Sequence, residues 1–469
     1  MPAAGSGDGS GQVCVHRRVP LVLRRHTPKE SDFVAAEEGT PSRRKPSRRQ
    51  PPSVVARAAV SAALEQGFER VTVEMICSRA DISRSTFFNH FQSRDAAIIG
   101  KPLTVPGPEV THPIFSRHAE DLVRGLLELQ VPSLAHRTAD ADVLRDRTRL
   151  ITEQPAAMSQ YSSGLIGVQN SLSDAVEGWL RANPQHARLP GDPRTEAVLA
   201  VTSGYAALYA ASQWWSIPLR DLPEPLAACL SAADALRSVV GVNDASRQES
   251  VPCIPVPEDT EDSGRAPGLR ERKRRDTENR IGLAAVRGAL ERGFEAVTVD
   301  EICEEAVISR STFFNYFPSR NAAIVGRPMN VLPPDAAYDV LSKHGRDTPA
   351  GTFALICASL ESTDPEVATL RAELAGKQPA ARDAGTTTLV DACAQFMTTV
   401  RDWLAANPQY SSIDGDPAYE ASLAANAAYA AISVMEGGWL GAAAKVQASA
   451  KDFTAAMADL RTILSSPAV

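Results

Sequence analysis

Residues 71–100 read VTVEMICSRADISRSTFFNHFQSRDAAIIG, and residues 297–326 read VTVDEICEEAVISRSTFFNYFPSRNAAIVG. The two stretches lie 226 positions apart and share 21 of 30 residues. Two copies of one domain are usually brought together by a symmetric dimer of two identical chains. Here both copies belong to one polypeptide, which indicates a built-in pair of equivalent sites.

Length and composition agree with a folded chain of several domains. The 469 residues suit two to four domains, and 43% hydrophobic with 22% charged residues is ordinary for a folded protein. The net charge of −7 is not that of a protein that coats nucleic acid, so the distribution of charge matters more than its sum. Seven scattered cysteines form neither a CxxC motif nor a Cys/His cluster. We therefore expect no metal site and no cofactor.

Several protein classes are disfavoured by missing motifs. The chain has no Gly-rich phosphate loop, no GxSxG and no HExxH, and its eight histidines form no cluster, so an enzyme is not expected. No apolar run approaches the roughly 20 residues of a membrane span, and no signal peptide is recognisable. The expected location is the cytoplasm.

Composition divides the chain into repeated parts. Residues 1–46 are rich in Gly, Ser, Pro and Arg and are predicted to be a disordered basic leader, and residues 241–268 contain four prolines and are predicted to be a linker. Further repeats at an offset of 224 extend the duplication through both halves. Ala/Leu-rich runs broken at Asn-Pro and Gly-Asp-Pro predict helical bundles. The predicted fold is all-α: two tandem copies of an N-terminal three-helix unit (47–100 and 269–326), each followed by a C-terminal helical domain (101–240 and 327–466).

The repeated segment has the pattern of a helix-turn-helix (HTH). Helical spacing runs over 54–66, Thr72 is a candidate N-cap for 73–79, and Ser83 caps a helix over 84–91. In this motif the second helix enters the major groove of DNA. Its inward face carries Phe87 and Phe91, while polar residues occupy the free face.

These residues resemble the DNA-binding domain of the TetR family of transcriptional repressors. The resemblance rests on Thr72, Ser83, the run Thr86-Phe87-Phe88-Asn89-His90-Phe91 and Ser93-Arg94, with counterparts at Thr298, Ser309, 312–317 and Ser319-Arg320. The family commonly has Gly in the turn, where this chain has Asp81 and Val307. Because valine adopts a positive φ only at a cost, we expect the second turn to be reshaped.

The resemblance assigns DNA contacts residue by residue. Arg and Asn suit guanine and adenine edges, so the expected base readers are Arg84, Asn89, Arg310 and Asn315. The other expected DNA contacts, mainly to phosphate, are Thr72, Ser85, Thr86, Phe88, His90, Arg94, Thr298, Ser311, Thr312, Phe314, Tyr316 and Arg320. The charge balance is +5 over 43–100 (10 basic, 5 acidic) and +1 over 269–326 (10 basic, 9 acidic). The first copy should therefore contribute more of the salt-dependent affinity for DNA. The basic segments before both units are either arms that contact DNA or only solvated linker charge.

The resemblance also implies that the C-terminal domains dimerise and hold a small apolar effector. Candidate effector contacts are Tyr205, Tyr209, Gln213, Trp215, Tyr429, Met435 and Trp439, for which ordinary core or interface packing is the competing interpretation. The implied function is a ligand-responsive repressor in which one chain acts as a monomeric pseudo-dimer on a DNA operator with two half-sites. Higher homo-oligomers remain open. Two competing functions are a chain in which only the first copy reads DNA, and a helical sensor or scaffold that has lost DNA binding.

Overall fold

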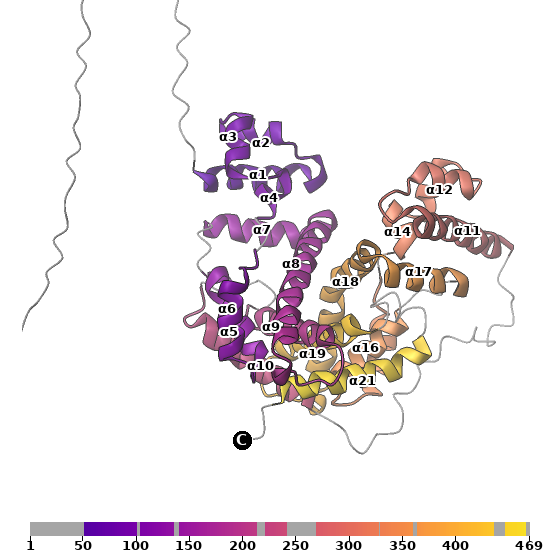
Figure 1. Ribbon diagram of the computed structural model, residues 1–469. Helices are drawn as coiled ribbons and strands as arrows, with labels where there is room; N and C mark the ends of the chain where they lie inside the picture. The colour runs from indigo at the N-terminus through magenta and orange to yellow at the C-terminus, as the bar shows by residue number, and fades with distance from the viewer. Residues whose placement is uncertain are drawn as a thin grey trace, which may run out of the picture. The chain divides into compact units, whose positions relative to one another are not determined.

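The computed structural model describes residues 51–100, 104–135, 140–212, 221–241, 269–327, 329–359, 364–435 and 446–465. The leader expected at 1–46 lies outside these ranges, as does the linker apart from Gly241. Every regular element within them is a helix, which confirms the all-α class (Figure 1). None of the described helices is long and apolar enough to cross a membrane.

Among the described residues, every element of the first half except η1 has a counterpart in the same order in the second half, and most of them are labelled in Figure 1. The first half contains α1 (Pro52–Gln66), η1 (Phe68–Arg70), α2 (Val73–Ala80), α3 (Arg84–His90), α4 (Arg94–Ile98), α5 (Pro108–Arg117), α6 (Leu122–Ala135), α7 (Ala141–Glu153), α8 (Pro155–Ala182), η2 (Pro184–His186), α9 (Pro193–Ala211) and α10 (Pro225–Gly241). The second half contains α11 (Leu269–Arg292), α12 (Val299–Glu305), α13 (Arg310–Tyr316), α14 (Arg320–Val325), α15 (Pro334–Ser342), α16 (Thr348–Ala358), α17 (Pro365–Lys377), α18 (Pro379–Ala406), η5 (Pro408–Tyr410), α19 (Pro417–Val434) and α21 (Val446–Leu464). We call residues 51–100 and 269–326 the first and second HTH units, and the helices that follow each of them the first and second bundles.

The first helix of the HTH unit differs between the copies. α1 begins at Pro52, a residue that suits a first helical turn because its missing N–H needs no partner there. At the offset of 226, Pro52 corresponds to Glu278, so α11 is longer at its start by the nine residues 269–277. The second basic segment is therefore helical. The first, at 43–49, lies outside the described residues.

The turn between the two motif helices is the same in both copies. Asp81 has φ 51° and Val307 has φ 54°, so both adopt the left-handed conformation. The expectation of a reshaped second turn is therefore wrong. The backbone N–H of Ile308 donates to the carbonyl of Cys303 at 2.9 Å, matching the 3.0 Å bond from Ile82 to Cys77. These bonds and the partly buried isoleucines hold the turn although valine itself disfavours it.

The two HTH units differ in how their cores are closed. The first has a separate core that Val143 and Leu150 of α7 and Ala157 of α8 complete. The core of the second is continuous with that of the bundles. In both copies the helix before the long bundle helix packs against the first helix of the HTH unit, as α7 does on α1 and α17 on α11. Each HTH unit is thus fixed to its own bundle by hydrophobic contact.

The two bundles meet through equivalent helices. α8 packs against α18, and α9 against α19. Arg237 Nε donates to the carbonyl of Leu464 at 2.8 Å, and Arg461 Nε donates to the carbonyl of Val240 at 2.8 Å. These four residues are related by the repeat offset of 224, so the contacts are reciprocal. Reciprocal contacts are the signature of a twofold interface, here between two halves of one chain.

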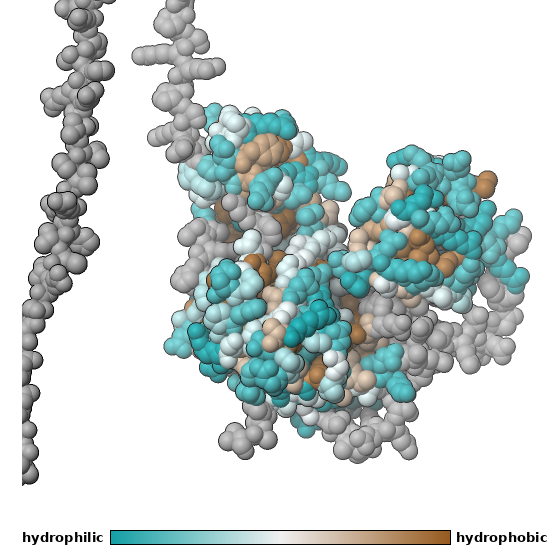
Figure 2. Space-filling view, in the orientation of Figure 1, coloured by the Kyte–Doolittle hydropathy of each residue, from teal (hydrophilic) through white to brown (hydrophobic). Residues whose placement is uncertain are grey.

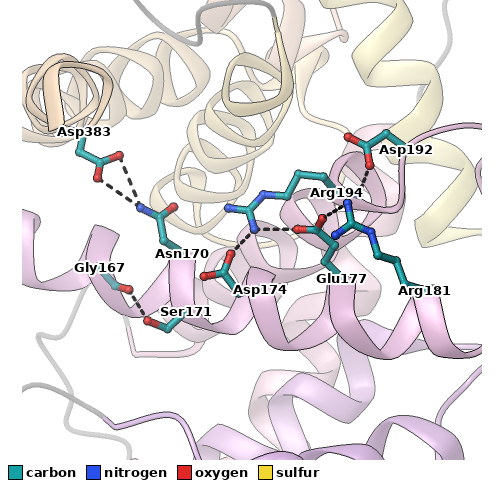
Figure 3. Close-up of polar contacts among 9 residues, drawn as sticks. All are labelled: Gly167, Asn170, Ser171, Asp174, Glu177, Arg181, Asp192, Arg194 and Asp383. Carbon is teal, nitrogen blue, oxygen red and sulfur yellow. Dashed lines mark hydrogen bonds and ion pairs between the residues drawn. The ribbon is translucent and has the colours of Figure 1, made fainter. Parts of the chain in front are cut away.

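Other polar contacts across this interface occur on one side only. Asn170 Nδ2 of α8 lies 3.4 Å from both carboxylate oxygens of Asp383 on α18 (Figure 3). The repeat counterparts of this pair are Ala394 and Ser159, which leave no equivalent contact. The buried hydroxyl of Tyr429 donates to Gln169 Oε1 at 3.1 Å. The helices and the two arginines of the interface thus follow a twofold arrangement, whereas some of its side-chain contacts have no counterpart in the other half.

Candidate nucleic-acid interface

We call α3 and α13, the second helices of the two HTH motifs, the recognition helices. Both are capped in the same way. Ser83 Oγ accepts from the backbone N–H of Thr86 at 3.1 Å, and Ser309 Oγ accepts from Thr312 at 3.1 Å. Phe87 and Phe313 are fully buried below each helix. One face of each helix is therefore anchored in the core, and the residues between the anchors are presented to solvent.

The base-reader candidates lie on this exposed face in both copies. Asn89 and Asn315 are exposed, as are Arg84 and Arg310. Short exposed side chains that offer both an amide donor and an acceptor can pair with adenine, and a guanidinium can pair with guanine. The geometry thus places the four expected readers where a major groove could be contacted.

Each arginine expected to read a base lies over an exposed aromatic ring. The guanidinium carbon of Arg84 is 5.5 Å from the centre of the Phe88 ring, and that of Arg310 is 5.8 Å from Phe314. The two rings are 46% and 48% exposed, and Figure 2 shows hydrophobic surface on both HTH units among mostly hydrophilic residues. Cation–π contact restricts the arginine to the surface of the recognition helix.

An acidic residue on the preceding helix completes each group. Arg84 forms an ion pair with Glu74 of α2, and Arg310 forms one with Asp300 of α12 at 2.6 Å. The nearby Arg84 contributes to a lowered pKa of Glu74, after the larger effect of the backbone N–H of Glu74 itself. Neither acid was expected from the sequence to belong to the site, although an acid stands ten residues before the arginine in both copies and could have indicated the pair.

The hydroxyls proposed to bind phosphate are already part of the helix caps. Ser85 Oγ lies 2.8 Å from Ser83 Oγ, and the hydroxyl of Thr86 lies 2.9 Å from the same atom. Ser311 and Thr312 repeat the arrangement around Ser309 at 2.9 and 2.8 Å. A hydroxyl has one donor and two acceptor sites, so the group retains capacity for a further contact.

Thr72 and Thr298 cap the first helix of each motif. Thr72 Oγ1 accepts from the N–H of Met75, and Thr298 Oγ1 accepts from the N–H of Glu301, both at 3.3 Å. In the second copy Glu301 also accepts from the backbone N–H of Thr298 at 2.7 Å, which makes a capping box. The expected N-cap role is confirmed for both threonines.

Arg94 and Arg320 bind the HTH unit itself. Arg94 Nη1 donates to the carbonyls of Glu69 and Val71 at 3.3 and 3.2 Å, and Arg320 Nη1 donates to the equivalent carbonyls of Glu295 and Val297 at 3.1 and 3.2 Å. Each guanidinium also lies over a phenylalanine ring of its own unit. These contacts brace the segment before the motif. His90 and Tyr316, the remaining phosphate candidates, are half-buried.

The described effector candidates lie inside the protein. Tyr205, Tyr209, Tyr429 and Met435 are all buried, and the rings of Tyr205 and Tyr209 have centroids 6.0 Å apart. Burial raises the pKa of Tyr209 well above its usual value, with the neighbouring Tyr161 and Tyr205 as smaller causes. The other three candidates, Gln213, Trp215 and Trp439, lie outside the described residues. No cluster of potential metal ligands occurs among the side chains that the structure describes.

Comparison with known proteins finds one family in two places. Residues 56–97 and residues 283–322 both match the family model described as bacterial regulatory proteins, tetR family. The two matched segments extend from the first helix of each HTH unit into its fourth helix. No curated protein matches the chain.

Proposed function

We propose that this chain, which carries two TetR-like HTH DNA-binding domains in tandem, is a cytoplasmic sequence-specific transcriptional repressor. It binds an operator with two half-sites through α3 and α13, and a small apolar molecule releases it. The observation that carries the proposal is the repetition of one exposed face, with Arg, Asn and Phe at the same positions, on two capped helices. A purely structural repeat would need to preserve only the buried face.

The reciprocal contacts between the bundles support a pseudo-dimer within one chain. Arg237 and Arg461 cross the interface in opposite directions, as the two copies of one residue do in a symmetric homodimer. Because the halves are linked, their pairing does not depend on protein concentration. A single chain therefore presents two HTH units to DNA.

Buried polar groups support an effector site in the first bundle. Gln130 Oε1, Ser162 Oγ and Ser203 Oγ are buried on α6, α8 and α9, and within the described structure they have no hydrogen-bond partner. Their repeat counterparts are Ile356, Thr386 and Ala427. Of these, Thr386 donates its hydroxyl to the carbonyl of Arg382 at 2.9 Å. Unpaired buried polar atoms cost free energy that a ligand can recover. Within the described residues the second bundle holds two such atoms, Thr348 Oγ1 and Ser422 Oγ, against these three in the first. The first bundle, where three packed helices contribute one each, is the proposed effector-binding half, with Tyr205 and Tyr209 as candidate contacts.

One observation favours a chain with a single DNA-reading unit. α12 carries Glu304 and Glu305 as exposed residues at the positions where α2 carries Ser78 and Arg79. Two added negative charges weaken attraction to phosphates. In this second candidate function only the first HTH unit binds a half-site.

Selection of binding sites from random DNA by the full-length protein distinguishes these possibilities. Winning sites are then titrated by gel shift across a salt series. Two similar half-sites at fixed spacing support the proposal, one half-site supports the single-reader function, and absence of enrichment contradicts DNA recognition. In the first case Arg84→Ala with Arg310→Ala should reduce discrimination at the arginine-read bases by about 1–3 kcal/mol per contact. Unchanged specificity would reject the arginines as readers, and Arg145→Ala with Arg401→Ala is a control for lost surface charge.

A further inference from the structure

A glutamine joins each long bundle helix to the HTH unit. Gln154 lies between α7 and α8. Its Oε1 accepts from the backbone N–H of Phe68 at 2.7 Å, and its Nε2 donates to the carbonyl of Ala63 at 3.0 Å. Ala63 is in the last turn of α1 and Phe68 begins η1. One amide thus binds a donor and an acceptor at the end of α1, where the Ala63 carbonyl also accepts from the N–H of Gly67. Two hydrogen bonds therefore join the start of α8 to the end of α1.

An arginine makes the second connection. Arg147 on α7 donates from Nε to the carbonyl of Ile98 at 2.8 Å and from Nη2 to the carbonyl of Ala97 at 2.9 Å. These carbonyls are at the end of α4, where backbone acceptors lack partners within the helix. Gly100 follows with φ 116°, and a Cβ built at this position would lie 3.4 Å from Arg147 Nη1. The chain leaves α4 close against the guanidinium.

The second half contains the same two connections. Gln378 accepts from the N–H of Phe294 at 2.7 Å and donates to the carbonyl of Ala289 at 2.8 Å. Arg371 donates to the carbonyls of Ile324 and Ala323 at 2.9 and 3.2 Å. Arg371 is nine-tenths buried, and burial lowers its pKa to about 10, so the guanidinium is still charged at neutral pH. We call the four side chains Arg147, Gln154, Arg371 and Gln378 the clamp residues.

The helices joined by the clamp residues contact the HTH motif on one side and the interface between the bundles on the other. α1 packs against α2 and α4, and α11 against α12 and α14, so a fixed first helix fixes the recognition helix beyond it. On the other side, α8 and α18 contact each other at the interface between the bundles. The path from one HTH unit to the other therefore runs through Gln154, α8, α18 and Gln378.

We propose that the clamp residues are positioning residues for DNA binding: they hold each HTH unit to α8 or α18, so that the crossing of these two helices sets the separation of α3 and α13. The inference rests on the proposed function. It predicts that loosening the clamp leaves each HTH unit able to bind a half-site. Only the gain from binding two half-sites at one spacing is lost, because a less rigid linkage lowers the effective concentration of the second unit.

The test uses the full chain with Gln154→Ala and Gln378→Ala together, and separately Arg147→Met with Arg371→Met. Affinity is measured for a single selected half-site and for two half-sites with spacers lengthened by about 1 to 5 base pairs, half a helical turn at most. We expect single-site affinity to change by less than about twofold. Two-site affinity at the best spacing should fall by on the order of tenfold, and its dependence on spacing should flatten. Exchange of the Phe68 and Phe294 amide hydrogens with solvent should become faster in the glutamine variants.

Two exposed glutamines of the same long helices provide a control. Gln160→Ala with Gln395→Ala removes exposed glutamines from α8 and α18 and should leave both affinities unchanged. If the alanine variants do not fold, Gln154→Glu with Gln378→Glu keeps the acceptor and removes the donor. Unchanged two-site affinity, or a parallel loss of single-site affinity, overturns the positioning role. Failure of the unmodified chain to bind any DNA overturns the proposed function instead.

Discussion

Arg84 and Arg310 are each held by an acid and an aromatic ring before DNA is present. Exposed ion pairs contribute only about 0–1 kcal/mol, whereas a bidentate contact with guanine contributes about 1–3 kcal/mol of discrimination. A guanine edge can therefore displace Glu74 or Asp300 from the arginine. A base that binds the arginine more weakly than guanine displaces the acid less often. The acid also repels phosphates close to the recognition helix. Under the proposed function, both effects disfavour DNA that offers no guanine to these arginines.

We predict that Glu74→Gln with Asp300→Asn increases affinity for random DNA several-fold and reduces the preference for the selected operator. The reason is that each arginine loses its competing carboxylate and each HTH unit loses one negative charge. Gel shifts with operator and random DNA at one salt concentration measure the ratio. Glu109→Gln with Asp335→Asn is the matched control, since these acids begin α5 and α15 at equivalent positions in the two bundles. An unchanged ratio contradicts the prediction.

At the scale of one element, the second turn stores backbone strain. Val307 has φ 54° and is 81% exposed, so it gains little burial in return for a conformation that a β-branched residue disfavours. We predict that Val307→Gly stabilises the second HTH unit by about 1 kcal/mol, because removing the strain outweighs the greater freedom of glycine in the unfolded chain. Thermal unfolding measures this. Asp81→Gly is the comparison and should gain less, since Asp tolerates positive φ; equal gains contradict the argument.

The N-caps of α2 and α12 provide a second test at this scale. Thr298 shares a capping box with Glu301, whereas α2 has Met75 at the corresponding position. Thr298→Ala should therefore destabilise the protein more than Thr72→Ala, by about 1 kcal/mol or less in difference. Hydrogen bonds from the backbone N–H and the hydroxyl of Thr298 lower the pKa of Glu301.

The pH dependence of this difference follows from the lowered pKa. A carboxylate whose pKa is depressed by folding stabilises the protein above its unfolded pKa, and the contribution disappears as pH falls through the folded pKa. The difference between the two threonine variants should thus shrink on acidification below about pH 4. Denaturant titrations of both variants at neutral and acidic pH measure it. A difference that grows in acid would be incompatible with the capping box as its source.

At the scale of the whole molecule, the interface between the bundles is built for unlike halves. If two second halves paired, Asp383 would face Ala394 instead of Asn170 and would lose its donor. Burial raises the pKa of Asp383, with Asn170 among the groups that oppose this shift, so the carboxylate needs its partner. Pairing within one chain keeps the contact. The contact therefore favours pairing of a first half with a second half over pairing of two second halves.

We predict that Asn170→Asp destabilises the interface by about 1–3 kcal/mol, because two partly buried carboxylates then face each other. Adding Asp383→Asn should restore stability, since the pair is then present with its members exchanged. Thermal unfolding and the affinity for two half-sites measure both effects. Ser171→Asp is the control: its hydroxyl donates to Gly167 on the exposed side of α8 (Figure 3). The prediction fails if the double variant is no more stable than Asn170→Asp alone.

Local patterns determined the helical elements and the motif. Cap residues such as Thr72 and Ser83 and the spacing of Phe87 and Phe91 act within a few residues of the chain, so α2 and α3 were predictable to within one residue at each end. The second HTH unit was predictable as well, because the same pattern occurs a second time in the chain. The exposure of Arg84 and Asn89 followed from the period of an amphipathic helix.

Tertiary structure decided what depends on residues far apart in the chain. The left-handed turn at Val307 is held by hydrogen bonds and packing that outweigh the preference of valine. The engagement of Arg94 with backbone carbonyls and the clamp at Gln154 join segments about 25 and 90 residues apart, and no local pattern encodes them. The reciprocal contacts of Arg237 and Arg461 connect the two halves. The sequence alone determined that there are two HTH units of one kind; only packing between distant helices decided how each is held and how the halves pair.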